Sequence, residues 1–243
     1  MNLLAFDTST EHLSVALSWS DGADPRLLAR RGEGGRESSS TLIPATQALV
    51  REAGLTLAAL DAIVFGCGPG SFTGLRTACA VAQGLAFGAD RPVLAVETLL
   101  AVAEEARHAQ GATRVLALLD ARMDEVYGAA YLYDGQAWQR QGPITLGRPE
   151  SVVLPAGYVL AGNAFAAYGD RLPAGDRLEA WPTATALLRV APGLIGSGAA
   201  VLAHEALPLY VRDKVAQTTD ERLALRAAAA AAAVPVAPVP AAP

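Results

Sequence analysis

The sequence predicts an α/β protein made of two related lobes, of which the second is reduced. The main observation is a strand–turn–strand unit that occurs twice. Residues 3–22 (LLAFDTSTEHLSVALSWSDG) align without a gap with residues 116–135 (LALLDARMDEVYGAAYLYDG). In both, an apolar strand ends in an acid, Asp7 or Asp120, and a polar turn leads to a second apolar strand that stops at Asp-Gly.

The order of elements in the first half is the second observation. Short apolar segments alternate with longer segments of helical character, which is typical of an α/β lobe with a mixed sheet. A hairpin at the start of each half is also how the actin/Hsp70-like phosphotransferase fold (the ASKHA class, ribonuclease H-like) begins. Strands are expected at residues 3–7, 13–19, 26–31, 62–67 and 92–96, and helices at about 42–53, 72–87 and 98–108.

Several boundaries follow from turn and cap residues. Gly54 suits a helix C-cap and Thr98 a helix N-cap. Pro44 either begins the first helix or kinks it. In the second half, residues 158–161 are a candidate strand, and Thr183 is a candidate cap of a helix interrupted at Pro192.

Three regions are therefore expected. Residues 1–110 form the first lobe and residues 111–220 the reduced second lobe. Residues 221–243 are rich in Ala and Pro, and this composition predicts a disordered tail.

Composition limits the class of function. The chain has 243 residues, 52% of them hydrophobic, and a formal net charge of −5, which argues against a role as the main nucleic-acid surface. No apolar stretch approaches the roughly 20 residues that span a bilayer, and no signal sequence is recognised, so a cytoplasmic protein is expected. Cys67 and Cys79 match no metal or redox spacing and are predicted to be buried thiols. The three histidines stand apart in the sequence, and no metal site is predicted.

A glycine-rich turn between a strand and a helix, Gly66–Arg76 (GCGPGSFTGLR), is the sharpest local signal. Free backbone N–H groups at such a helix start can hold an anion. The turn fails the Walker pattern, and Ser71 or Thr73 stands where the dinucleotide fingerprint needs its third glycine. A tight turn that brings the helix close to the sheet is the alternative interpretation.

The two strand-end acids are the other candidates. In actin-like folds the turn Asp7-Thr8-Ser9 would face nucleotide phosphates, and Asp120 is its counterpart in the second lobe. Both acids could instead be hydrogen-bonded turn residues. The residues after Asp120 are Ala121-Arg122-Met123 and not glycines, which weakens the nucleotide hypothesis. We assign no cofactor and no catalytic residue.

The helix at 72–87 is apolar on nearly all sides, so it must be covered on more than one side. One cover is the sheet, and the other is either a helix of the same chain or a partner chain. With the preceding helix it is predicted to form a docking face. The candidate interface residues are Leu42, Ile43, Thr77, Ala78, Val81, Ala82 and Leu85.

At this point the chain resembles a known family. Gly68–Arg76 (GPGSFTGLR), Asp120–Tyr127 (DARMDEVY) and Leu207–Arg212 (LPLYVR) with Val215-Ala216, in that order, are similar to the TsaB family of bacterial tRNA threonylcarbamoyladenosine biosynthesis proteins. The resemblance covers about residues 1–220. It implies the actin-like fold and a relationship to the catalytic protein TsaD.

The resemblance also implies a role. TsaD carries a His-x-x-x-His metal pair just after the strand that corresponds to 92–96, whereas residues 97–102 here (ETLLAV) contain no histidine. A non-catalytic subunit is therefore expected, which binds TsaD as a heterodimer, recruits TsaE to that complex and meets tRNA only through it. The alternative is an autonomous actin-like ATP-dependent phosphotransferase or hydrolase. Whether the chain homodimerises alone, and whether a nucleotide binds at the partner interface, stay open.

Overall fold

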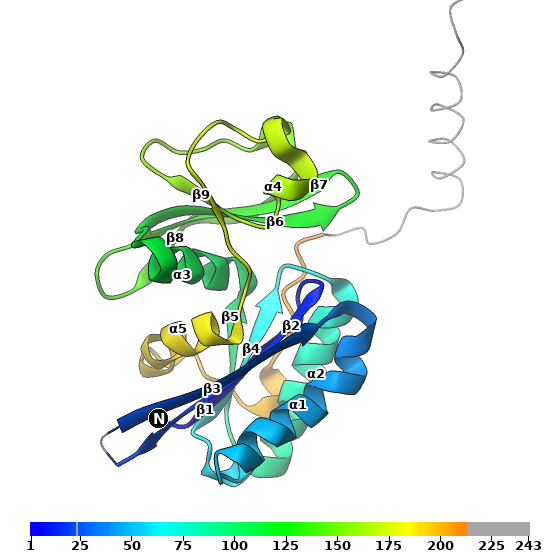
Figure 1. Cartoon of the computed structure of the whole chain (residues 1–243), viewed down its shortest axis with the longest axis vertical. Helices are drawn as coiled ribbons and strands as arrows, with labels where there is room; N and C mark the ends of the chain where they lie inside the picture. Colours follow the sequence, from blue (N-terminus) through cyan, green and yellow to red (C-terminus); the bar gives the residue numbers. More distant parts are fainter. Residues whose placement is uncertain (23, 213–243) are drawn as a thin grey trace, which may run out of the picture. The chain divides into compact units, whose positions relative to one another are not determined.

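The computed structural model describes residues 1–22 and 24–212, and two five-stranded sheets form its frame (Figure 1). The first sheet has the order β3-β2-β1-β4-β5. Its strands are β1 (Leu3–Asp7), β2 (His12–Asp21), β3 (Asp24–Glu33), β4 (Ala62–Gly68) and β5 (Val93–Glu97). β1 pairs antiparallel with β2 and parallel with β4. Because β1 is buried on both faces, it is a continuous apolar run up to its final acid.

The second sheet repeats this topology, with the order β10-β9-β6-β7-β8. Its strands are β6 (Arg114–Arg122), β7 (Glu125–Tyr133), β8 (Trp138–Gly147), β9 (Val159–Gly162) and β10 (Arg177–Glu179). β6 pairs antiparallel with β7 and parallel with β9, as β1 does with β2 and β4. The two hairpins therefore occupy equivalent positions; Asp7 ends β1, and Asp120 lies in β6 just before the register shift that precedes its last residue, Arg122.

The gapless alignment of the two hairpins needs one correction. Ala5 pairs with Ala16, but Leu118, which aligns with Ala5, pairs with Gly128 and not with Ala129. A register shift between Asp120 and Arg122 accounts for the difference. The turn of the second hairpin is one residue shorter than that of the first. The second strands of the two hairpins, β2 and β7, therefore match only when one is offset by one residue.

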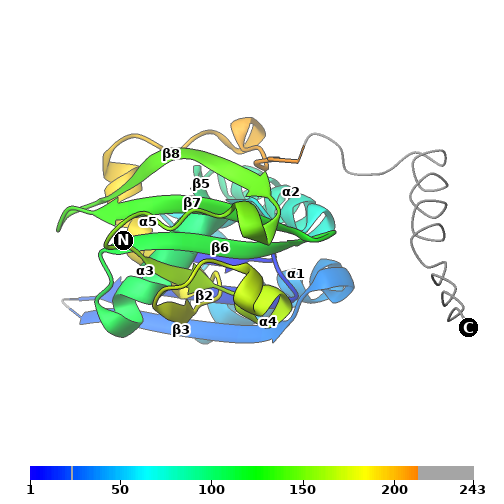
Figure 2. The ribbon, with the colours of Figure 1, turned by 90° about the horizontal axis from the view of Figure 1, so that it is seen from above.

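The helices lie in layers between and around the sheets (Figures 1 and 2). They are α1 (Ser38–Glu52), α2 (Phe72–Ala89), α3 (Thr98–Gln110), α4 (Phe165–Tyr168) and α5 (Ala184–Gly196), with short 3₁₀ turns at Gly35–Glu37, Leu57–Ala59, Pro149–Ser151, Gly169–Arg171 and Ala203–Glu205. α1 and α2 cover one face of the first sheet, and α5 covers the other. α3 packs on the second sheet and against α5. Alternation along β1 divides its side chains between these layers, since Leu4 and Phe6 face α1 and α2 whereas Leu3 and Ala5 face α5.

The chain returns to the first sheet near its end. α5 packs on β1 and β2, Val201 forms a bridge with Val93, and the Leu209 N–H donates to the Cys67 carbonyl at 2.7 Å. Residues 1–211 thus form one compact unit in which the later part of the second half covers the first sheet. The predicted tail at 221–243 lies outside the described residues.

The structure decides the expectations about prolines and helix caps one by one. Pro44 lies inside α1, and α5 continues through Pro192 to Gly196. Thr98 is the first residue of α3 and does not cap it; its hydroxyl is buried without a hydrogen-bond partner among the described residues. Thr183 does cap α5, because its side chain accepts from the Ala186 N–H at 3.0 Å. No helix in residues 1–22 and 24–212 has the length and apolar character to cross a membrane.

Candidate functional site

The glycine turn after β4 is filled by the turn of the first hairpin. A Cβ on Gly66 would lie 1.8 Å from a carboxylate oxygen of Asp7, and one on Gly70 would lie 2.5 Å from the Ser9 carbonyl oxygen. A Cβ on Gly74 would lie 1.8 Å from the Thr8 carbonyl oxygen. Gly66, within β4, therefore leaves room for the Asp7 side chain, whereas Gly70 and Gly74 allow the hairpin turn to approach the start of α2.

Hydrogen bonds hold the two turns together. The Ser71 N–H donates to the Ser9 carbonyl at 2.7 Å, and the Thr8 hydroxyl donates to the Gly74 carbonyl at 2.7 Å. The Gly74 N–H reaches the Ser71 side chain at 3.4 Å, so Ser71 is the N-cap of α2. Two of the backbone N–H groups that could have held an anion, those of Ser71 and Gly74, are thus engaged within the chain. This geometry favours the tight-turn interpretation of the glycine motif.

Asp7 is completely buried beneath this turn. Its Oδ1 accepts from the Ser9 N–H at 2.9 Å and from the Ser9 hydroxyl at 2.6 Å, while Oδ2 has no hydrogen-bond partner among the described residues. Burial raises the pKa of the Asp7 carboxyl to about 6, although the two bonds from Ser9 act in the opposite direction. Of the predicted candidates, Asp7, Thr8 and Ser9 thus come together as parts of one packed turn.

Asp120 has an equivalent position with different surroundings. Its Oδ1 accepts from the Arg122 N–H at 2.8 Å, as Asp7 accepts from Ser9, and from the Tyr168 hydroxyl at 2.7 Å. Its Oδ2 pairs with the Arg122 guanidinium at 2.8 Å. Arg122 also reaches Glu11 of the first hairpin turn at 3.5 Å, so an exposed ion pair links the two turns.

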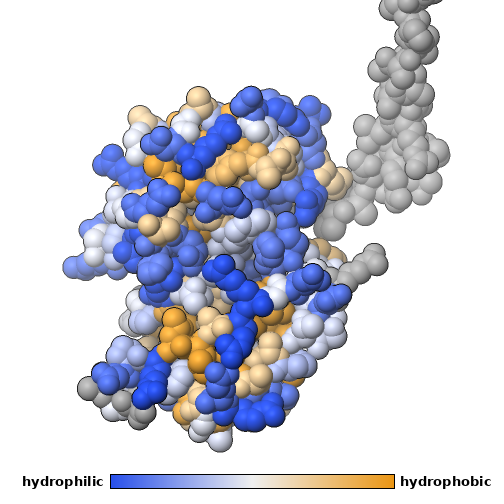
Figure 3. Space-filling view, viewed as in Figure 1, coloured by the Kyte–Doolittle hydropathy of each residue, from blue (hydrophilic) through white to orange (hydrophobic). Residues whose placement is uncertain are grey.

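The predicted docking helices present a mixed surface. Leu42, Ala78 and Ala82 are fully buried against the first sheet and offer no surface to a partner, because they lie on the inner sides of α1 and α2. Thr77, Val81 and Leu85 are half-buried, and Ile43 is exposed. The exposed residues of α2 are Phe72, Thr73, Arg76, Ala80, Gly84, Phe87 and Gly88, and those of α1 include Ile43, Pro44, Gln47 and Arg51. On the face drawn in Figure 3, apolar side chains reach the surface on both sides of a hydrophilic band over the first sheet.

Comparisons with known proteins identify the family. A family model described as "TsaD: tRNA N6-adenosine threonylcarbamoyltransferase" matches residues 32–233. The tRNA threonylcarbamoyladenosine biosynthesis protein TsaB of Escherichia coli K12 is 37% identical over 227 residues, which are 89% of this chain and 96% of that protein. The chain belongs to the TsaB family.

Other relatives agree with this assignment. TsaB of Haemophilus influenzae is 44% identical over 128 residues, 52% of each chain. The solved structure of YeaZ from Pseudomonas aeruginosa superposes with a TM-score of 0.79 at 42% identity, covering 86% of this chain and 99% of that one. A second Pseudomonas aeruginosa structure, described as an uncharacterized protein with similarity to peptidase YEAZ, gives a TM-score of 0.80. The TsaB-family chain thus has the actin-like, ribonuclease H-like fold that its two hairpins predicted.

In this TsaB-family chain, the region after β5 is occupied by a structural network. The Glu97 carboxylate accepts from the Tyr131 hydroxyl at 2.7 Å and from the Arg140 guanidinium at 2.9 Å. These bonds tie the end of β5 to β7 and β8. Within residues 1–22 and 24–212, no three His, Cys, Asp or Glu side chains gather as metal ligands would.

Proposed function

We propose that this chain is a non-catalytic subunit of the machinery that makes threonylcarbamoyladenosine in tRNA, and that it acts by binding a TsaD protein. The family supports the pathway, because a relative that matches 89% of the chain is named for threonylcarbamoyladenosine biosynthesis. One structural observation supports a non-catalytic role. The turn Asp7-Thr8-Ser9, which would face phosphates in an actin-like enzyme, is buried against the glycine turn of the same chain.

The docking surface in this proposal is the outer side of α1 and α2. Ile43 and Phe87 expose large apolar side chains there, and Phe87 is 83% exposed. Ala80 and Gly84 are small and outward, and a Cβ on Gly84 would meet nothing within 4 Å. Small outward residues let a partner helix approach closely, and exposed aromatics provide the anchors that dominate such interfaces. TsaE and tRNA would then be met only through the complex with TsaD.

A charge at the centre of this surface tests the proposal. Ala80→Glu keeps the fold, because Ala80 is exposed, but it places a carboxylate in the middle of the interface. We expect co-purification with TsaD from the same organism to fall at least tenfold. Thr77→Arg, at a half-buried position on the same side, should have a similar effect.

Two controls separate binding from folding. Val153→Glu introduces the same charge at a site that is 80% exposed and lies outside α1 and α2, so binding to TsaD should be unchanged. Circular dichroism melting should show that Ala80→Glu and Val153→Glu are both folded. Undiminished binding by a folded Ala80→Glu variant would place the docking surface elsewhere.

The alternative function, an autonomous phosphotransferase or hydrolase, predicts a different result. The purified chain would bind and hydrolyse ATP with Mg²⁺, and the conservative change Asp7→Asn would abolish turnover. Under our proposal, the chain alone shows neither steady ATP hydrolysis nor threonylcarbamoyl transfer. Analytical ultracentrifugation of the chain alone and with TsaD would also decide whether a homodimer competes with the heterodimer for the same surface.

A further inference from the structure

We propose that Phe72, Arg76 and Tyr210 form an anchor cluster that receives a carboxylate side chain of the partner protein, TsaD. The cluster lies where two of the motifs that carry the family resemblance meet, Gly68–Arg76 at the start of α2 and Leu207–Arg212 near the end of the described residues. The inference rests on the function proposed above. It adds the chemical group that the partner brings to one end of the docking surface.

The segment that carries Tyr210 is held beside α2 and β4 through its backbone. The Ala206 carbonyl accepts from the Gln83 side chain of α2 at 2.9 Å. The Leu209 N–H donates to the Cys67 carbonyl at the end of β4 at 2.7 Å. These bonds place Tyr210 next to α2 without using its side chain.

The guanidinium of Arg76 is oriented by both aromatic rings. Its Cζ atom lies 3.9 Å from the centre of the Phe72 ring, one turn earlier on α2, and 5.9 Å from that of Tyr210. Its Nε donates to the Tyr210 hydroxyl at 2.9 Å. In the described part of the chain, the donors on Nη1 and Nη2 have no acceptor. The Tyr210 hydroxyl accepts from Arg76, so its own proton is left to donate as well.

The anchor cluster is exposed, and its charge is not balanced within residues 1–22 and 24–212. Phe72 is 38% exposed and Tyr210 is 45% exposed, so neither ring is a core residue. Arg76 forms no ion pair in that part of the chain. The cluster therefore presents a cation in a fixed orientation at the surface.

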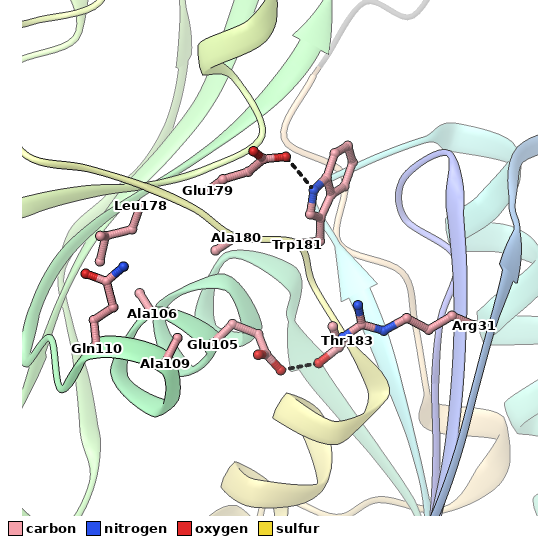
Figure 4. Close-up of a pocket in the computed structure, with 10 residues that line it drawn as sticks. All are labelled: Arg31, Glu105, Ala106, Ala109, Gln110, Leu178, Glu179, Ala180, Trp181 and Thr183. Atoms are coloured by element: carbon pink, nitrogen blue, oxygen red, sulfur yellow. Dashed lines mark hydrogen bonds between the residues drawn. The ribbon is translucent and has the colours of Figure 1, made fainter.

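Glu105 shows how a structural charge is arranged in the same chain. In the small pocket beside α3 drawn in Figure 4, its carboxylate accepts from the Thr183 hydroxyl. The Arg189 guanidinium donates to the same carboxylate at 2.6 Å, so the charge that holds α3 to α5 has its counter-charge inside the chain. Arg76 differs because its hydrogen-bond partner, the Tyr210 hydroxyl, is neutral.

Charge and composition together favour a carboxylate from a protein. A guanidinium binds a carboxylate through paired N–H donors, and Nη1 and Nη2 offer such a pair. Arg76 is the sole charged residue of α2, and the chain has a net charge of −5, whereas a nucleic-acid backbone needs several clustered cations. Arginine and tyrosine are also residue types that dominate protein interfaces. The aromatic rings would shield the ion pair from water.

Arg76 lies on the same side of α2 as the proposed docking surface. Ala80 and Gly84 follow it at intervals of four residues, and residues at this spacing share one face of a helix. A partner seated on Ala80 and Gly84 therefore also reaches Arg76.

The test measures binding of the purified full chain to purified TsaD from the same organism by isothermal calorimetry. Arg76→Gln removes the charge at an exposed position and should weaken binding at least tenfold. Arg76→Lys keeps the charge but loses the paired donors, so it should weaken binding by a smaller factor, about threefold. Raising the salt concentration should weaken binding of the unaltered chain more than that of Arg76→Gln.

The matched control is Arg177→Gln. Arg177 is another exposed arginine that lies over an aromatic ring, that of Phe165 at 5.7 Å, but it is outside α1 and α2. The control variant should bind TsaD as the unaltered chain does. Circular dichroism melting should show that Arg76→Gln and Arg177→Gln are both folded.

A double-mutant cycle identifies the partner group. Exposed Asp and Glu residues of TsaD are changed one at a time to Asn or Gln, and each TsaD variant is titrated with the unaltered chain and with Arg76→Gln. One of these changes should weaken binding to the unaltered chain about tenfold. The same change should cost nothing further with Arg76→Gln, because the pair is already broken.

The outcomes separate the anchor cluster from the proposed function. If Ala80→Glu disrupts binding while a folded Arg76→Gln binds as tightly as the unaltered chain, docking on α2 stands and the anchor cluster is overturned. It is also overturned if no TsaD carboxylate couples to Arg76, or if Arg177→Gln weakens binding as much as Arg76→Gln does. Loss of self-association with unchanged TsaD binding would assign the cluster to a second copy of this chain and overturn it too. If the unaltered chain does not bind TsaD, both proposals are wrong.

Discussion

The turns of the two hairpins begin alike and end in different environments. Each starts with an acid at the end of the first strand, and each acid accepts a hydrogen bond from the backbone two residues later, Ser9 in one turn and Arg122 in the other. The first turn is buried beneath the start of α2. The second lies at the surface, where Met123 is 56% exposed. The two turns thus share the hydrogen bond that follows the acid but differ in how deeply they are buried.

The surroundings explain what each turn can tolerate. The first turn is packed against glycines and leaves the acid in a low-dielectric environment. The second is held by ion pairs, with Asp120 on Arg122 and Asp124 on Arg171 at 2.5 Å, and it contains three consecutive non-glycine residues with positive φ. The conformation of the first turn is therefore fixed by packing, and that of the second by ion pairs. Substitutions that add side-chain volume should therefore destabilise the protein when they are made in or against the first turn. Substitutions that relieve backbone strain should change its stability when they are made in the second turn.

The largest effect is expected from Gly74→Ala. The new methyl group would lie 1.8 Å from the Thr8 carbonyl oxygen, and a backbone atom cannot move aside as a flexible side chain can. We expect a loss of about 3 kcal/mol or more in the free energy of unfolding, measured by urea denaturation. Gly84→Ala is the matched control in the same helix, where the methyl group enters open space. It should stabilise the isolated chain by about 0.5–1 kcal/mol. Equal effects of both changes would contradict the packed-turn interpretation.

Next in size is the pH dependence of Asp7→Asn. The folded-state pKa of Asp7 is raised from 3.8 to about 6, so the folded chain holds this proton more tightly than the unfolded chain does. Its stabilising contribution is complete below pH 3.8 and is lost as the pH rises through 6. A shift of this size corresponds to about 3 kcal/mol, and asparagine does not titrate.

The measurement for Asp7 is a difference between two proteins. Urea denaturation of the natural chain and of Asp7→Asn between pH 4 and pH 7.5 should show the natural chain losing about 2.5 kcal/mol relative to the variant, because the remainder is lost below pH 4. Titration of all other groups cancels to first order in this difference. A constant gap across the pH range would mean that Asp7 is ionised when folded and that its burial is relieved by a partner group.

Sequence patterns predicted the parts of the fold that are local. Both hairpins were recognisable because each has an apolar strand, an acid and a glycine turn within about 20 residues. The strand β8 was missed because many of its residues are polar and exposed, so it lacks an apolar alternation. The return of α5 to the first sheet is a tertiary event that no local pattern encodes. The one-residue register shift in the second hairpin depends on a bulge, which has no reliable sequence signal.

The site was predictable to a similar degree. The glycine turn and the acids Asp7 and Asp120 were found, but choosing between an anion site and a tight turn required knowledge of what fills the turn. On α2, Ala82 faces inward and Ala80 outward, and a helix that is apolar on nearly all sides has too little periodicity to separate them. The small pocket lined by Arg31, Glu105 and Thr183, among others, was not predicted, because these residues come from segments that are far apart in the sequence.

The smallest effect is expected from relieving strain in the second turn. Met123 has a φ of 56°, and a side chain in this left-handed region costs about 1 kcal/mol that glycine does not incur. Met123→Gly should therefore stabilise the chain by less than about 1 kcal/mol, since glycine also loses more backbone entropy on folding. Thr10 aligns with Met123 in the first turn, is nearly buried and accepts from the His12 N–H at 3.2 Å. Thr10→Gly should instead destabilise by about 1–2 kcal/mol, because it removes that bond and frees the unfolded backbone. Opposite signs in thermal melting of the two variants would support the contrast between a packed turn and a strained one, whereas equal losses would show that the second turn depends on its side chain as much as the first.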